Sequence, residues 1–191
     1  MEKKLVFIGN SIVNGFPYER SQCFASLVEH YTGYTVVNRG INGDTSANIL
    51  SRFSEDVLSE EPDAVFILTG TNDFIYGEAS PQQAFENLSK MAAMSVSNAK
   101  PITPVFMTPL PVNAPMASEK WISGEGIDYN RINDALEALA GLTKSSGFRF
   151  IDLNSKYREC GKYLDGVHPL PEGHRFIADI ISEYIKRSNT I

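Results

Sequence analysis

Residues 5–15 read LVFIGNSIVNG, an apolar run that ends in a turn carrying Ser11. Gly9 and Asn10 stop the run after four apolar residues, so it is too short for the hydrophobic part of a signal peptide and indicates a buried strand. In open parallel sheets, ligands bind beyond the carboxyl ends of the strands. This stretch therefore predicts a first strand together with the edge of the sheet at which a functional site forms.

The same alternation continues along the chain. Further apolar runs lie at 35–37, 64–69, 104–108 and 148–153, and segments with the apolar spacing of helices separate them. Strands that alternate with helices predict an α/β three-layer sandwich of about five parallel strands, with helices on both faces. At 191 residues the chain has the length of one domain, and we expect a single domain over 1–191.

Composition excludes several classes of protein. A hydrophobic fraction of 42% with 21% charged residues is typical of a folded globular chain, and a net charge of −6 argues against nucleic-acid binding. Cys23 and Cys160 stand far apart and outside any metal-binding spacing, so neither a metal site nor a disulfide framework is expected. We expect no membrane span and a cytoplasmic location, since no long apolar run and no signal peptide is visible. Nothing in the sequence specifies an oligomeric state.

Polar residues follow four of the five predicted strands. Ser11 follows the first, Gly43 the second and Asn72 the third, while Asp165 and His168 come after the fifth. A serine hydroxyl needs a base to become a nucleophile, and an imidazole held by a carboxylate supplies one. Taken alone, the DGVHP segment at 165–169 is more often a turn with a surface histidine, so only the convergence of these loops favours catalysis.

An attacked carbonyl develops an oxyanion, which requires hydrogen-bond donors placed in advance. The amides of Ser11 and Gly43 and the side-chain NH₂ of Asn72 are candidates. The alternatives are a turn glycine at 43 and a local side-chain turn at Asn72 and Asp73, both of which are common. His30 is expected on the surface and His174 in a structural role.

Four sequence blocks, in order, resemble those of the SGNH hydrolases, also called GDSL esterases and lipases. They are Gly9, Asn10, Ser11 and Gly15; Asn38, Gly43, Asp44 and Thr45; Gly70, Asn72 and Asp73; and Asp165, Gly166, His168 and Pro169. The resemblance implies a flavodoxin-like strand order 2-1-3-4-5. It also implies that Ser11 is the nucleophile, His168 the base and Asp165 its partner, with Ser11, Gly43 and Asn72 as oxyanion donors. Asn10 stands where the family usually has aspartate, which removes one negative charge beside the site.

These observations predict a serine ester hydrolase that cleaves small carboxylic esters or thioesters, with short-chain acyl or acetyl groups, and needs no metal or organic cofactor. The alternative is a flavodoxin-like module that binds a small molecule or glycan without catalysis; the absence of a glycine-rich phosphate loop after the first strand counts against nucleotide binding. Phe74, Leu110 and Trp121 are candidate substrate-binding residues. The connection from Pro109 to Gly126 is a candidate wall of the binding site.

Overall fold

The computed structural model of the chain describes residues 3–121 and 126–187. Within these residues five parallel strands form one sheet in the order β2-β1-β3-β4-β5, which confirms the predicted order 2-1-3-4-5. The strands are β1 (Lys4–Gly9), β2 (Thr35–Gly40), β3 (Ala64–Leu68), β4 (Thr103–Met107) and β5 (Phe150–Ile151). The α-helices are α1 (Ser11–Asn14), α2 (Phe24–Thr32), α3 (Ser46–Asp56), α4 (Thr71–Ile75), α5 (Pro81–Ser97), α6 (Ala114–Lys120), α7 (Tyr129–Ser145), α8 (Leu153–Cys160) and α9 (Pro171–Arg187), and the short 3-10 helices are η1 (Arg20–Gln22) and η2 (Leu58–Glu60).

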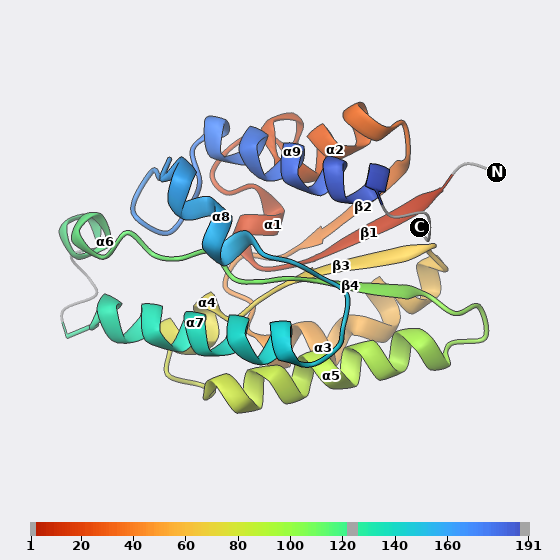
Figure 1. Ribbon diagram of the computed structural model, residues 1–191, viewed down its shortest axis with the longest axis horizontal. Helices are drawn as coiled ribbons and strands as arrows, with labels where there is room; N and C mark the ends of the chain where they lie inside the picture. Colours follow the sequence, from red (N-terminus) through yellow and green to blue (C-terminus); the bar gives the residue numbers. More distant parts are fainter. Residues whose placement is uncertain (1–2, 122–125, 188–191) are drawn as a thin grey trace.

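Helices cover both faces of the sheet, as predicted. In Figure 1 the sheet is seen almost edge-on, with α2 and α9 above it and α3, α5 and α7 below it. Successive strand residues point to opposite faces, so Leu5 and Phe7 of β1 pack in the core beneath α2 and α9, while Val6 and Ile8 pack in the core over α3, α5 and α7. Burial on both faces explains why the central strands read as continuous apolar runs.

The carboxyl ends of β1, β2 and β3 meet closely. Gly9 is the register partner of both Gly40 in β2 and Leu68 in β3. A Cβ atom on Gly40 would lie 2.2 Å from the backbone nitrogen of Asn14, and one on Gly9 would lie 2.4 Å from the carbonyl oxygen of Leu68. These glycines let α1 sit directly on the strand ends, and α1 begins with Ser11.

The structure differs from the sequence-based expectation around β5. The strand spans only 150–151 rather than 148–153, because the Asp152 side chain accepts a hydrogen bond from the Ser155 amide and starts α8 at Leu153. The connection from Pro109 to Gly126, the candidate wall of the binding site, is partly helical. It contains α6, whose first turn is capped by Asn113, and its residues 122–125 lie outside the described part of the chain.

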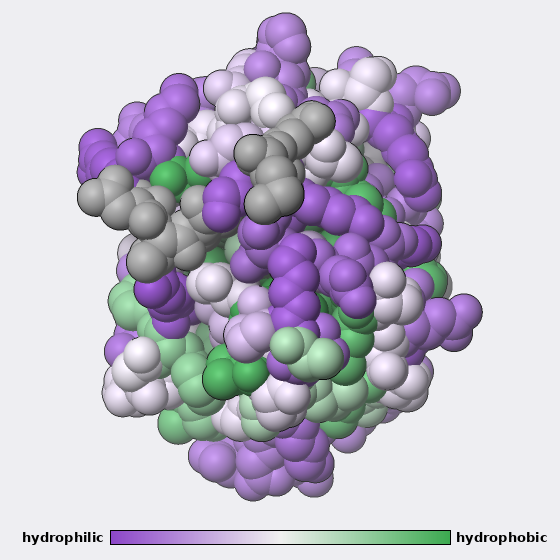
Figure 2. Space-filling view, turned by 90° about the vertical axis from the view of Figure 1, so that its right-hand side faces the viewer, coloured by the Kyte–Doolittle hydropathy of each residue, from purple (hydrophilic) through white to green (hydrophobic). Residues whose placement is uncertain are grey.

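The opposite end of the molecule, where the strands begin, carries surface ion pairs. Figure 2 looks onto this end and shows hydrophilic side chains over much of its upper half, with hydrophobic ones between them lower down. Lys4 bonds the Glu60 carboxylate at 2.5 Å, and Asp63 lies within 4.0 Å of the ammonium groups of Lys3 and Lys100. Among residues 3–121 and 126–187, no helix is long and apolar enough to cross a membrane.

Candidate active site

Ser11, His168 and Asp165 form a continuous chain of hydrogen bonds. Ser11 Oγ lies 2.9 Å from His168 Nε2, across 157 residues of sequence, and His168 Nδ1 lies 2.7 Å from Asp165 Oδ2. Ser11 and His168 are only 8% and 5% exposed. A histidine whose Nδ1–H is held by a carboxylate presents an unprotonated Nε2 to the hydroxyl, which is the geometry for deprotonating a serine nucleophile.

The local fold around Ser11 depends on Asn10. The buried Asn10 side chain caps α1, its Oδ1 accepting a hydrogen bond of 3.0 Å from the Ile12 amide. Gly15, with φ of +92°, ends the helix after one turn. An amide oxygen caps a helix about as well as a carboxylate does. Asn10 therefore fulfils this structural task without the negative charge that aspartate would place beside Ser11.

The two oxygens of Asp165 hold His168 from two directions. Oδ2 accepts from the imidazole, and Oδ1 accepts from the backbone amides of Val167 and His168 at 2.9 and 2.8 Å. Burial raises the pKa of Asp165, but the hydrogen bonds from His168 and Val167 outweigh it and hold the pKa below the ordinary value. The carboxylate thus stays ionised at neutral pH and remains an acceptor for the imidazole Nδ1–H.

Gly43 and Asn72 line the same cleft as Ser11 and His168. This cleft has a volume of about 320 Å³. Gly43 has φ of +86°, a conformation that glycine adopts readily, and a Cβ built there would lie 3.7 Å from the Tyr76 hydroxyl. Asn72 Nδ2 donates one hydrogen to the Asp44 carbonyl at 2.9 Å. An NH₂ group carries two hydrogens, and within residues 3–121 and 126–187 the second one is free to meet a ligand in the cleft.

Asp73, next to Asn72, is buried and fixes the start of α3. Both of its carboxylate oxygens lie 3.0 Å from the Ser46 amide, and Oδ1 accepts from the Ser46 hydroxyl at 2.5 Å. The Asn87 side chain of α5 donates to the same hydroxyl at 2.9 Å. Asp73 thereby links α4, α3 and α5 behind the cleft.

Aromatic rings surround the imidazole. The Trp121 ring is stacked 6.0 Å from the His168 ring, and the Phe16 ring meets it edge-on at 5.0 Å. Trp121 was expected in the binding site and lines the cleft, whereas Phe16, Asn42 and Val167 line it without having been singled out. Their positions within a few residues of Ser11, Gly43 and His168 are the signal that would have found them.

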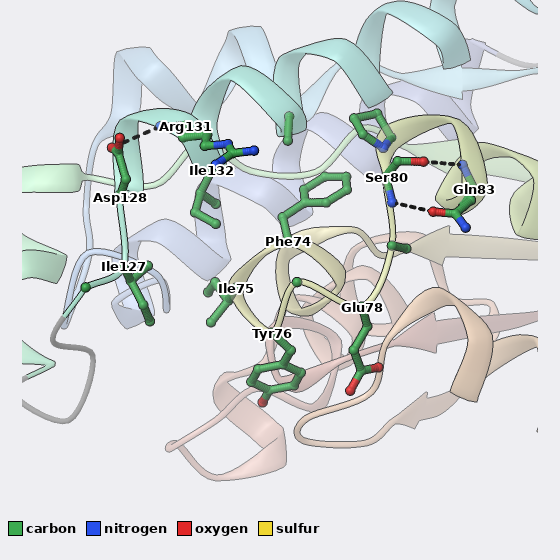
Figure 3. A pocket seen from close by; sticks show the side chains of 15 residues that line it. Phe74, Ile75, Tyr76, Glu78, Ser80, Gln83, Ile127, Asp128, Arg131 and Ile132 are labelled. Carbon is green, nitrogen blue, oxygen red and sulfur yellow. Dashed lines mark hydrogen bonds between the residues drawn. The ribbon is translucent and has the colours of Figure 1, made fainter.

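A second cleft, of about 640 Å³, adjoins the first and shares Ile75 and Tyr76 with it. Figure 3 shows this second cleft between α4 and α7, with Phe74 and Ile75 on one side, and with Arg131 and Ile132 on the other. Phe74 thus lies in the neighbouring cleft rather than beside Ser11.

Leu110 does not reach either cleft, contrary to the expectation for it. Its side chain is 1% exposed and packs in the core beneath α2 and α9, because an apolar side chain at the end of β4 gains more from burial there. His30 is exposed on α2, as expected. His174 is fully buried, and its ring stacks 5.9 Å from that of Phe24.

Comparisons with known proteins agree with the fold. The chain matches the model of the GDSL-like lipase/acylhydrolase family over residues 7–176. It is similar to an acetylxylan esterase from Geobacillus stearothermophilus, with 27% identity over 209 aligned residues that cover 92% of this chain and 90% of that one. An arylesterase from Vibrio mimicus is 36% identical over 97 residues, and this match spans 48% of each protein, about half its length. The crystal structure of a lipase/acylhydrolase from Enterococcus faecalis is 24% identical, with a TM-score of 0.77 and coverage of 96% of this chain and 95% of that one.

The fold and the family match define an enzyme of the α/β class that hydrolyses esters. The chain belongs to the GDSL-like lipase/acylhydrolase family. This membership favours the hydrolase over the non-catalytic binding module that the sequence also allowed.

Proposed function

We propose that the chain hydrolyses small carboxylic esters or thioesters through an acyl-enzyme on Ser11. The observation that carries this proposal is the chain of hydrogen bonds from Ser11 through His168 to Asp165, of which Ser11 and His168 line the cleft. Each residue then has one task. Ser11 is the nucleophile, His168 is the general base and acid, and Asp165 orients the imidazole.

The first half of the reaction forms the acyl-enzyme. Ser11 Oγ bonds to the carbonyl carbon while its proton passes to His168 Nε2, and the carbonyl oxygen becomes an oxyanion. His168 then returns this proton to the leaving alcohol or thiol as the bond between carbon and leaving group breaks. In the second half a water molecule repeats these steps, giving the acid and free Ser11.

The oxyanion would be stabilised by the amides of Ser11 and Gly43 and by the side chain of Asn72. Ser11 is the first residue of α1, where amide groups have no partner within the helix. The positive φ of Gly43 sets the direction of its peptide group, and Asn72 is held by Asp44. Donors fixed in advance cost little reorganisation when the charge develops.

The cleft at Ser11 favours short acyl groups, from acetyl to hexanoyl. Its volume of about 320 Å³ lies at the small end for ligand sites, and its lining includes the apolar or aromatic residues Phe16, Ile75, Tyr76, Trp121 and Val167. The acetylxylan esterase among the relatives supports acetyl esters as substrates.

Trp121 would form one wall of this cleft, so Trp121→Ala is expected to lower kcat/KM for these esters. Unchanged kinetics would assign the indole a structural role.

Hydrolysis of p-nitrophenyl esters from acetate to dodecanoate tests this function. Ser11→Ala should lower kcat by about 10⁴-fold or more, because the residual rate without the nucleophile comes from binding and the oxyanion donors alone. Ser51→Ala is the matched control, since this serine of α3 is exposed and donates to the main-chain carbonyl of Asn48 in its own helix. Near-normal turnover by Ser11→Ala contradicts the mechanism. Rates that keep rising beyond octanoate contradict the short-chain specificity alone.

A further inference from the structure

One arginine on α3 connects the ends of β1 and β2 with the loop that precedes α3. Arg52 Nε donates to Asp44 Oδ2 at 2.7 Å, and Nη2 donates to the carbonyl oxygens of Arg39 and Gly9 at 2.9 and 3.2 Å. Nη1 bonds the carboxylate of Asp56 on the same helix. A single guanidinium thus holds the end of β1, the end of β2 and the loop that precedes α3.

Two of these acceptors, Gly9 and Asp44, lie close to proposed site residues in the sequence. Gly9 is two residues before Ser11, and Asp44 directly follows Gly43. The Asp44 carbonyl also accepts the hydrogen bond from Asn72 Nδ2. A shift of Asp44 would therefore move two of the three donors, and a shift of Gly9 would move the third.

The contacts of Arg52 are well protected from water. Its side chain is 16% exposed and that of Asp44 is 13% exposed, so the pair is less screened than an ion pair on the surface. The planar guanidinium offers five N–H donors in a fixed fork, whereas a lysine ammonium is a compact point charge on a flexible stem. The four acceptors around Arg52 therefore require the fixed arrangement of donors that a guanidinium has and an ammonium lacks.

We propose that Arg52 is a positioning residue for the oxyanion site. It touches no substrate. It holds Gly9, which precedes Ser11 by two residues, and Asp44, which follows Gly43 and accepts the hydrogen bond from Asn72, so the three donors keep their relative positions. This inference rests on the proposed function of those three residues. It extends that function to a residue outside the cleft, since Arg52 is absent from the cleft lining.

Three variants test the proposal: Arg52→Gln, Arg52→Lys and the matched control Arg39→Gln. The Arg39 side chain belongs to the same cluster of charges and pairs with Glu60 and Asp56, whereas the Arg52 side chain bonds Gly9 and Asp44 beside the proposed donors. Reactive sites are titrated with a fluorophosphonate, and kcat and KM for p-nitrophenyl acetate are expressed per titrated site. Counting titrated sites removes the contribution of unfolded molecules.

Both Arg52 variants should lose about 10- to 100-fold in kcat, with KM changed less than about 3-fold, because the donors act mainly on the transition state and tolerate little misplacement. Arg52→Lys should be impaired although it keeps the charge. Arg39→Gln should stay within about 2-fold of the wild type. A double variant, Arg52→Gln with Asp44→Asn, should remain as slow as Arg52→Gln.

Four outcomes would overturn the proposal. They are a normal kcat per site in Arg52→Gln or Arg52→Lys, a loss confined to KM, an equal loss in Arg39→Gln, and recovery in the double variant, which would assign the effect to the unpaired charge of Asp44. If the wild type itself is not labelled at Ser11, the proposed function fails. If the wild type is labelled and the Arg52 variants turn over normally, only the inference about Arg52 fails.

Discussion

At the scale of single residues, the site depends on side chains that each hold another in place. Asp165 fixes His168 through both the ring and the main chain, and Asp44 fixes Asn72 through its carbonyl. Such supports matter because a donor held in advance loses no freedom as the oxyanion forms. The effect of removing one of these groups should therefore be seen in turnover rather than in binding.

Asn72→Ala is expected to lower kcat by about 10²–10³-fold with little change in KM, because the lost donor acts on charge that is present mainly in the transition state. Steady-state kinetics with p-nitrophenyl acetate measures this split. Asn98→Ala, which removes a half-buried amide at the C-terminal end of α5, outside the cleft lining, is the control. A rise in KM at constant kcat would show that Asn72 binds the ground state only.

The sequence predicted some of these residue-level relations and missed others. Asp165 and His168 are three residues apart, so their contact follows from local spacing, and the loops after parallel strands had to meet at one edge. The distance from Ser11 to His168 depends on packing across 157 residues and was not predictable. Leu110 was placed in the pocket because its type suits a pocket, yet the same type suits the core equally well.

At the scale of elements, the turn from α4 to α5 separates two clefts. Tyr76 lines both of them and is 54% exposed, and its hydroxyl lies near Gly43. In Figure 3 its ring points away from α7, which forms the far wall of the larger cleft. Removing this ring would open the cleft at Ser11 toward the larger one.

Tyr76→Ala should therefore shift the preference toward larger substrates. We expect the ratio of kcat/KM for octanoate to that for hexanoate esters to rise about 10-fold, since two further methylenes gain about 0.8 kcal/mol each where surface becomes available to bury them. Tyr31→Ala, on the outer surface of α2, is the control. An unchanged ratio would mean that the two clefts do not act together on one substrate.

Helices and strands were predictable where the apolar residues follow a single pattern along the sequence, either a continuous run or helical spacing. The buried runs of β1, β3 and β4 were placed to within one residue. The end of β5 and the start of α8 were not, because FRFIDL at 148–153 reads as one apolar run, while the capping bond of Asp152 divides it. The second half of β2 was not predicted either, because Asn38 and Arg39 are polar and interrupt the apolar run. Pairing with β1 extends this strand to Gly40.

At the scale of the whole molecule, the layer of α2 and α9 contains a buried histidine that makes the fold sensitive to acid. His174 Nδ1 accepts a hydrogen bond of 3.4 Å from the Phe24 amide, and Nε2 has no partner within the described part of the chain. Burial, with a smaller contribution from the charge of His168, lowers the pKa of His174 to about 4. The folded protein thus keeps this imidazole neutral at pH values where the unfolded chain would protonate it.

The free energy of unfolding should consequently decrease as the pH falls from about 6.5 to about 4. In that window the unfolded state binds one more proton than the folded state, and the full effect is about 3 kcal/mol. Asp165, with its lowered pKa, loses its own contribution at more acidic pH. Urea denaturation at several pH values measures the decrease. His174→Gln should reduce the dependence of the free energy of unfolding on pH, and His30→Gln should leave it unchanged. An equally steep dependence in His174→Gln would contradict the assignment of this effect to His174.

The central claim is that Ser11 is the activated nucleophile, and mapping the adduct of a fluorophosphonate tests it most directly. After reaction at neutral pH, digestion and mass spectrometry should place a single adduct on Ser11, because the contact with His168 raises the reactivity of this hydroxyl above that of other serines. Labelling should be lost in Ser11→Ala, strongly slowed in His168→Ala and unchanged in Ser51→Ala. An adduct on another serine, or no adduct in a folded sample, would contradict the account.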